Sequence, residues 1–136
     1  MMDCVFCKIV SGEIPASILK ETSRSISFLD AFPLAKGHVL VIPKNHCQKI
    51  QDMSVEENTD LFSLVHSMIS KVDSITGSTL VAVHNGVEAG QEVPHVHVHL
   101  VPRSKDDSAG AIHSMFNSTL KLSESEINDL SDKLKV

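Results

Sequence analysis

The stretch PHVHVHLV, residues 94–101, alternates imidazole and apolar side chains and decides how this part of the chain folds. Successive side chains of a β-strand point to opposite faces, so His95, His97 and His99 share one face. Neighbours in this row are about 6.6 Å apart at Cα, from a rise of roughly 3.3 Å per residue. The apolar side chains at the even positions face the other way. We therefore predict a strand over residues 95–101, with its apolar face on the core and its histidines gathered on the other face.

Three more strands are predicted from apolar patterning. Residues 16–22 and 25–30 alternate weakly around a short polar turn, which predicts a β-hairpin. The apolar run HVLVIP, residues 38–43, ends at a proline and is typical of a buried strand. Residues 78–84, STLVAVH, indicate a further strand that precedes the histidine row.

One main helix is predicted between these strands. Ser54 followed three residues later by Glu57 is a capping box, so a helix begins there, and Gly77 ends its pattern. The apolar residues between them recur at helical spacing: Leu61, Leu64, Val65, Met68, Ile69, Val72 and Ile75. His66 falls on the polar side of this helix and is expected to be a surface residue.

The order of these elements predicts an α+β fold. We expect an antiparallel sheet of about five strands with one main helix plus short N- and C-terminal helices. A chain of 136 residues fits a single domain, residues 1–136, with a core at about 3–103. Residues 104–136 are expected to be a C-terminal extension, in which a second capping box, Ser123 with Glu126, opens a short helix.

Composition narrows the kinds of function. A net charge of -5 and the absence of Trp and Tyr argue against a nucleic-acid surface or a base-stacking platform. No apolar run approaches the roughly 20 residues that cross a membrane, and the opening MMDCVFCKIV does not read as a signal peptide. Three cysteines argue against a framework of disulfides, which indicates a reducing compartment. We therefore expect a cytoplasmic protein, with the nucleus as an alternative.

The histidine row and the loop before it indicate chemistry on a phosphate. Clustered imidazoles serve as metal ligands, or as nucleophiles and acid–base groups near neutral pH. The loop NGVEAGQEVP, residues 85–94, carries two glycines that let backbone N–H groups approach and hold an anion. Cys4-x-x-Cys7 by itself is compatible with packed small residues, a redox pair, or half of a zinc site that needs two more ligands.

The sequence resembles the histidine triad, or HIT, family. PHVHVHLV matches the family signature H-φ-H-φ-H-φ-φ, where φ is apolar, and the resemblance continues through HNGVEAGQEV, GHVLVIPKNH, FLDAFPLAKGH and CVFCKIVSGEIPA. It covers nearly everything from Asp3 to Arg103, with the blocks in matching order and spacing. The resemblance implies a HIT-like fold and a nucleotide hydrolase or transferase.

The resemblance also implies roles for individual residues. His97 would attack the α-phosphate of a purine nucleotide conjugate, a nucleoside phosphoramidate or dinucleoside polyphosphate, and form a nucleotidyl-histidine that water resolves. His99 would contact that phosphate, His38 would support the triad, and Gln91 would assist them. The other expected nucleotide-binding residues are Asp30 at the ribose, Asn85, Gly90 and Glu92 near the phosphate, and Phe6, Ile9, Ile26 and Phe28, for which base pocket and plain core are equal alternatives.

Glu92 departs from the family pattern. The phosphoramidase branch carries a serine there, whose hydroxyl assists the leaving group. An ionised glutamate only accepts hydrogen bonds, so Glu92 puts the phosphoramidase assignment in doubt but not nucleotide binding.

The resemblance supplies the two missing metal ligands. His46 and His95 match positions that bind zinc in members with a Cys-x-x-Cys pair, so Cys4, Cys7, His46 and His95 are expected to hold a structural zinc, with no organic cofactor. Cys47 is expected to be a bystander.

A homodimer is expected, joined by the helix and a sheet edge, without nucleic-acid or membrane partners. The alternatives are a catalytic metal on the three triad histidines and a non-catalytic nucleotide-binding adaptor.

Overall fold

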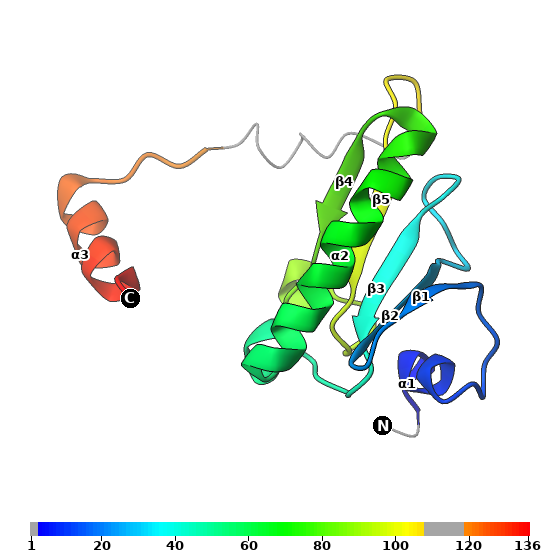
Figure 1. The fold of residues 1–136 in the computed structure, drawn as a ribbon. Coiled ribbons are helices and arrows are strands. Elements are labelled where there is room, and N and C mark those ends of the chain that lie inside the picture. The colour runs from blue at the N-terminus through cyan, green and yellow to red at the C-terminus, as the bar shows by residue number, and fades with distance from the viewer. Residues whose placement is uncertain (1–2, 108–118) are drawn as a thin grey trace.

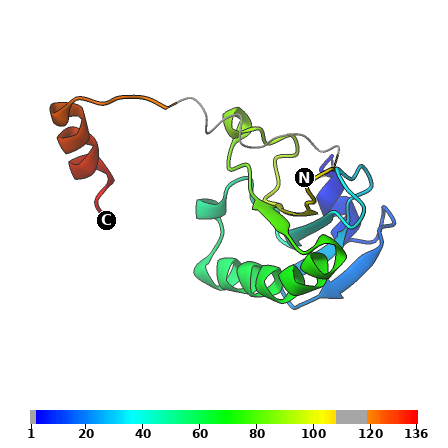
Figure 2. The ribbon, with the colours of Figure 1, turned by 90° about the horizontal axis from the view of Figure 1, so that it is seen from above.

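A computed structural model describes residues 3–107 and 119–136 of the chain. Its sheet has five strands in the order β1-β2-β3-β5-β4, with every neighbouring pair antiparallel. The strands are β1 (Ile18–Glu21), β2 (Ser25–Leu29), β3 (Val39–Pro43), β4 (Thr79–Ala82) and β5 (Val98–Pro102). Helix α2 (Val55–Thr76) covers one face, and the short helix α1 (Val5–Val10) lies on the other side (Figures 1 and 2). The predicted α+β fold is confirmed.

Each face of the sheet has its own hydrophobic core, because apolar residues alternate between the faces along the strands. On the α2 side, Val39, Val98 and Leu100 pack with the helix residues Leu61 and Val72. The opposite core joins α1 to β2 and β3 and consists of Cys4, Phe6, Ile26, Phe28, Leu40 and Ile42. The functional groups described below lie on this second face.

Helix α2 begins and ends where the sequence predicts. The Ser54 hydroxyl accepts a hydrogen bond from the Glu57 N–H at 3.1 Å, and the Glu57 carboxylate accepts one from the Ser54 N–H at 2.9 Å. Gly77 ends the helix in the left-handed conformation, with φ of 93°. Glu57 is itself buried and also accepts a hydrogen bond from Asn45 at 2.8 Å, which ties the helix start to the segment after β3.

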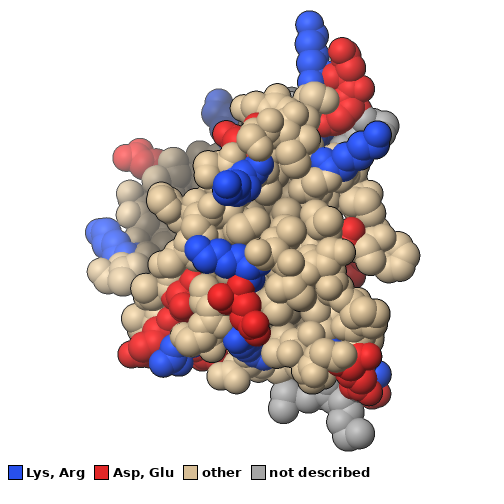
Figure 3. Space-filling model, turned by 45° about the vertical axis from the view of Figure 1, so that its right-hand side comes forward, with Lys and Arg blue, Asp and Glu red and all other residues tan. Residues whose placement is uncertain are grey.

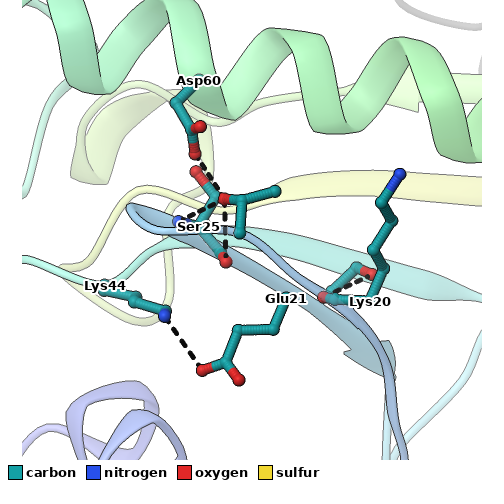
Figure 4. Close-up of polar contacts among 7 residues, drawn as sticks. Lys20, Glu21, Ser25, Lys44 and Asp60 are labelled. Atoms are coloured by element: carbon teal, nitrogen blue, oxygen red, sulfur yellow. Dashed lines mark hydrogen bonds and ion pairs between the residues drawn. The ribbon is translucent and has the colours of Figure 1, made fainter.

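Polar contacts fix the β1–β2 hairpin to its surroundings (Figure 4). Lys44, just after β3, forms an ion pair with Glu21 at 2.9 Å. The Thr22 hydroxyl in the turn donates to Asp60 of α2 at 2.5 Å and also lies 3.2 Å from the Ser25 carbonyl. The hairpin that the sequence predicts is therefore anchored to both a neighbouring strand and the helix.

Strand β5 begins at Val98, three residues later than predicted. Its pairing with β3 reaches only to Val98, and the residues before it bond elsewhere: the Val96 N–H donates to the Cys47 carbonyl at 2.7 Å. The predicted alternation nevertheless persists, since Val96 is buried in the α2-side core. The histidines therefore do face the other side, but only His99 lies within the strand.

The C-terminal helix α3 (Glu124–Leu134) starts at the predicted capping box of Ser123 and Glu126. None of its side chains is buried, and it lies apart from the sheet in Figures 1 and 2.

No helix in the described parts of the chain is long and apolar enough to cross a membrane. Figure 3 shows one face of the molecule, where acidic and basic side chains lie interspersed.

Candidate functional site

Four imidazoles gather on the sheet face away from α2. His99 lies in β5 and pairs with Leu40 of β3 on one side and Ala82 of β4 on the other. His97 precedes β5 and His38 precedes β3, and both are buried. His84 follows β4, two residues beyond Ala82. The ring centroids of His97 and His99 are 4.9 Å apart, and those of His38 and His99 are 5.2 Å apart.

The surroundings of His97 leave its Nε2 free to act as a nucleophile. Its Nδ1 is 2.7 Å from the His95 carbonyl, which only accepts, so Nδ1 carries the proton and Nε2 keeps its lone pair. Burial is the main cause of a lowered pKa at His97, which keeps the imidazole neutral. Phe6 packs against the ring with a centroid distance of 5.0 Å.

A chain of hydrogen bonds sets the opposite tautomer at His99. The Leu34 N–H donates to His38 Nδ1 at 3.0 Å, so neutral His38 carries its proton on Nε2. That nitrogen donates to His99 Nδ1 at 3.0 Å, which leaves the His99 proton on Nε2. Burial is the main cause of the lowered pKa values of both residues and brings that of His99 to about 4. Neutral His99 therefore presents an N–H beside the Nε2 lone pair of neutral His97.

Asp30 lies next to this relay, at the end of β2. Its N–H donates to the His38 carbonyl at 2.9 Å, and one carboxylate oxygen accepts from the Phe32 N–H at 2.9 Å. The other carboxylate oxygen is 3.5 Å from His38 Nε2. The side chain is partly exposed beside the histidines.

A second cluster, made of two thiols and two imidazoles, lies beside the first. The ligand atoms of Cys4, Cys7, His46 and His95 are all within 4.8 Å of one another. His95 Nε2 donates to the Pro43 carbonyl at 2.8 Å, so its Nδ1 lone pair faces the sulfurs of Cys4 at 3.5 Å and Cys7 at 3.6 Å. His46 Nδ1 is 3.3 Å from the Cys7 sulfur. Two sulfur and two nitrogen donors with a hydrogen-bonded outer nitrogen fit a tetrahedral zinc.

Cys47 lies outside this cluster, and His95 is its only member from the histidine triad. The Cys47 sulfur contacts the Asp52 carbonyl at 3.7 Å instead, and all three cysteines are free. Among the described residues, the only other group that could ligate a metal is Asp30, His38 and His99. His95, His97 and His99 together do not form such a group.

The amides of Asn85 and Gln91 are engaged with the segment after β3. Asn85 accepts from the Ile50 N–H at 2.8 Å and donates to Gln51 at 3.0 Å. Gln91 is buried and donates to the Gln48 carbonyl at 2.8 Å, while its Oε1 has no partner in the described part of the chain. These bonds fix the loop around the short helix Val87–Ala89, which precedes Gly90. The expected contact of both amides with a phosphate stays a prediction.

The candidate base-pocket residues divide into two kinds. Ile26 and Phe28 are buried in the α1-side core, which matches the core alternative, and Ile9 packs against that core while partly exposed. Phe6 belongs to the same core but also touches His97 and His95 with its ring. Glu92 is exposed, and its charge acts on His97.

Comparison with known proteins agrees with this geometry. Residues 11–106 match the family model of the HIT domain. The chain belongs to the HIT family. The adenosine 5'-monophosphoramidase hnt1 of Schizosaccharomyces pombe is 42% identical over 106 residues, which are 78% of each chain. The asymmetrical bis(5'-nucleosyl)-tetraphosphatase of the same yeast is 40% identical over 97 residues, 69% of this chain and 53% of that one.

Solved HIT structures share the fold. The histidine triad nucleotide-binding protein from Candida albicans superposes with a TM-score of 0.82 at 32% identity, covering 97% of this chain and 94% of that one. A zinc-bound histidine triad protein from Mycobacterium smegmatis superposes with a TM-score of 0.69 at 35% identity, covering 80% of this chain and 81% of that one.

Sequence reasoning missed one member of this HIT site, His84. Its ring lies 5.5 Å from that of His99, and its Nδ1 bonds to the Ala89 carbonyl at 2.6 Å. The sequence placed it only at the end of a strand. What places His84 beside His99 is the register of β4 against β5, whose last pair is Ala82 with His99. The sequence does not specify this register, so it carried no signal for His84.

Proposed function

We propose that this HIT protein is a hydrolase or transferase for purine nucleotide conjugates, and that His97 Nε2 takes the nucleotidyl group. The observation that carries the proposal is the pair of opposite tautomers: His97 presents a lone pair while His99 presents an N–H. One attacks phosphorus and the other donates to a non-bridging oxygen. The phosphoramidase and tetraphosphatase activities named for the two yeast relatives support a nucleoside phosphoramidate or dinucleoside polyphosphate as substrate.

The transfer would proceed in two displacements at the α-phosphorus. In the first, the His97 Nε2–P bond forms as the bond to the leaving group breaks. In the second, water attacks the phosphorus and the P–Nε2 bond breaks, which releases the nucleoside monophosphate. His38 holds His99 in its donor tautomer throughout, because its Nε2–H occupies His99 Nδ1.

The remaining expected residues would bind the nucleotide. Asp30 has a partly exposed carboxylate beside the histidines and would accept the ribose hydroxyls. Asn85 and Gln91 would shape the phosphate loop, and Glu92 would offer the phosphate its backbone N–H. The Gly90 N–H is bonded to the Val87 carbonyl at 3.0 Å, so Gly90 would contribute a close approach of the backbone instead. Phe6 and Ile9 would border the base, whereas Phe28 would support them from the core.

The proposal is tested by trapping the covalent intermediate. Wild-type protein mixed with a radiolabelled adenosine 5'-phosphoramidate and quenched in alkali should carry label on His97, located by peptide mass spectrometry. His97→Ala should carry none and should not turn over, while still binding AMP in a thermal-shift measurement. Nucleotide binding without turnover or adduct in the wild type would contradict the enzyme and establish the adaptor alternative.

We further propose that Cys4, Cys7, His46 and His95 hold a structural zinc. The donor set and the hydrogen bond from His95 to Pro43 support this, as does the zinc-bound relative. Zinc held by these four residues would supply a crosslink between α1 and the residues before β5, and it would leave His97 free. The three free cysteines, two of them in this cluster, support the cytoplasm or nucleus as its compartment. Strand β4, at one edge of the sheet, and helix α2 would form the homodimer interface.

A further inference from the structure

We infer that His84 is a fourth catalytic histidine, which gives a proton to the leaving group and then takes one from the attacking water. This assignment deepens the proposed function and rests on it. It gives the reaction a proton carrier that none of the triad residues supplies.

The position of His84 follows from strand pairing. β4 and β5 are antiparallel, with Ala82 opposite His99 as their last pair, so His84 follows the end of β4 on the face that Ala82 shares with His99. The His84 ring meets the ring of His99 edge to face, with centroids 5.5 Å apart and planes at 76°. His84 therefore borders the space between the nucleophile and the phosphate donor.

The loop after β4 fixes which nitrogen of His84 can exchange a proton. Nδ1 lies 2.6 Å from the Ala89 carbonyl, an acceptor, so this nitrogen keeps its proton. Nε2 alone changes between lone pair and N–H. Gly90, with φ of 100°, lies against the ring, and a Cβ there would be 3.0 Å from Nδ1 and 3.4 Å from Cε1. The loop thus holds the ring in one orientation, as proton transfer requires.

The other polar groups of the site are occupied or unsuited to this task. His97 Nε2 is consumed by its bond to phosphorus. The His38 proton is held by His99 Nδ1, and burial lowers the pKa of His99 to about 4, so a His99 imidazolium is rare at neutral pH. The carboxylates of Asp30 and Glu92 accept but do not donate while ionised. His84 is partly exposed, so its Nε2 can also exchange protons with solvent.

With His84 in this role, every proton in the two steps has a donor and an acceptor. In the first, the P–N bond of a phosphoramidate breaks as the His97 Nε2–P bond forms. The amine nitrogen takes the Nε2 proton of the His84 imidazolium, which leaves neutral His84 with its proton on Nδ1 and a lone pair on Nε2. In the second, the water oxygen bonds to phosphorus, the P–Nε2 bond breaks, and the water proton passes to His84 Nε2. One water is consumed, and His84 returns to its starting state.

The test compares two leaving groups in His84→Asn by rapid mixing. An alkylamine phosphoramidate of AMP needs a proton to leave, whereas the 4-nitrophenyl ester of AMP does not. In His84→Asn, transfer from the amine substrate should fall by about 10²- to 10⁴-fold. The nitrophenolate burst should stay close to wild type, followed by slow turnover while nucleotidyl-His97 accumulates. His66→Asn, on the exposed side of α2, should match wild type for both substrates.

Three outcomes would overturn the assignment. Equal losses with both substrates would mean that His84 binds phosphate or supports the fold, and unchanged rates would make it a spectator. A loss confined to the amine substrate in Glu92→Gln, and absent in His84→Asn, would assign the proton to Glu92. His84→Gln provides the same measurement if the asparagine variant unfolds. If the wild type forms no adduct with either compound, the proposed function fails. If the wild type forms the adduct but the His84 variants keep the wild-type selectivity between the two leaving groups, only the role of His84 fails.

Discussion

Individual residues of this site owe their chemistry to hydrogen-bond partners rather than to residue type. His97 is buried and His99 is half-buried, and both have lowered pKa values, yet one presents a lone pair and the other an N–H. The difference arises because His97 Nδ1 faces a carbonyl while His99 Nδ1 faces the Nε2–H of His38. His38 in turn is set by the Leu34 N–H, a backbone group that side-chain substitution does not remove.

We predict that His38→Ala slows nucleotidyl transfer by roughly 10²-fold, the cost expected when a catalytic group loses its fixed orientation. His99 would lose the donor on Nδ1, so its ring would populate both tautomers and rotate. Single-turnover rates with the 4-nitrophenyl ester of AMP measure this step directly. His66→Ala serves as the matched control, since that histidine is exposed on α2. A His38→Ala rate equal to wild type would show that the relay is not needed.

At the scale of elements, helix α2 is held by local and tertiary contacts at the same residue. Glu57 completes the capping box with Ser54 and also binds Asn45, the neighbour of the metal-ligand candidate His46. The hydrogen bond from the Ser54 backbone, followed by that from Asn45, lowers the pKa of Glu57. The helix start and the segment after β3 therefore depend on one ionised carboxylate.

This carboxylate predicts a pH-dependent contribution to stability. The pKa of Glu57 is lower in the folded state than the roughly 4.3 of an unfolded glutamate. The charge of Glu57 therefore stabilises the fold fully above pH ~4.3, and this stabilisation is lost as the pH falls through the pKa of the folded state. Urea unfolding should show Glu57→Gln less stable than wild type at pH 7, with the difference shrinking toward pH 3. Glu56→Gln, exposed in the same helix turn, should show a much smaller difference at every pH. A constant difference for Glu57→Gln would contradict the role of its charge.

At the scale of the whole molecule, the sheet separates two tasks. The face under α2 is an apolar core, while the other face carries the imidazole cluster and the Cys/His cluster, with α1 packed beside them. The metal-ligand candidates come from the N-terminus, from the segment after β3 and from the residues before β5. One crosslink at this place would join three distant parts of the chain.

We predict that purified protein carries about one zinc per chain and that Cys7→Ala loses it, with a lowered Tm, because structural zinc contributes directly to folding. Cys47→Ala, which removes a thiol outside the cluster, should keep the metal and most of the stability. Metal content is measured by atomic absorption and Tm by calorimetry. Below its lowered Tm, Cys7→Ala should still form the His97 adduct. Loss of the adduct from a folded, metal-free protein would instead favour a catalytic metal.

The sequence by itself determined the period-two row of histidines, the capping boxes of α2 and α3, and the strands around them, because these depend on local alternation and hydrogen bonding. It also predicted which side of the row faces the core, as the burial of Val96 confirms. Only the tertiary structure decided the rest. Strand register brought His84 beside His99, and the partners of Asn85 turned its amide toward residues 50 and 51. Those contacts join residues distant in the chain, and no local pattern encodes them.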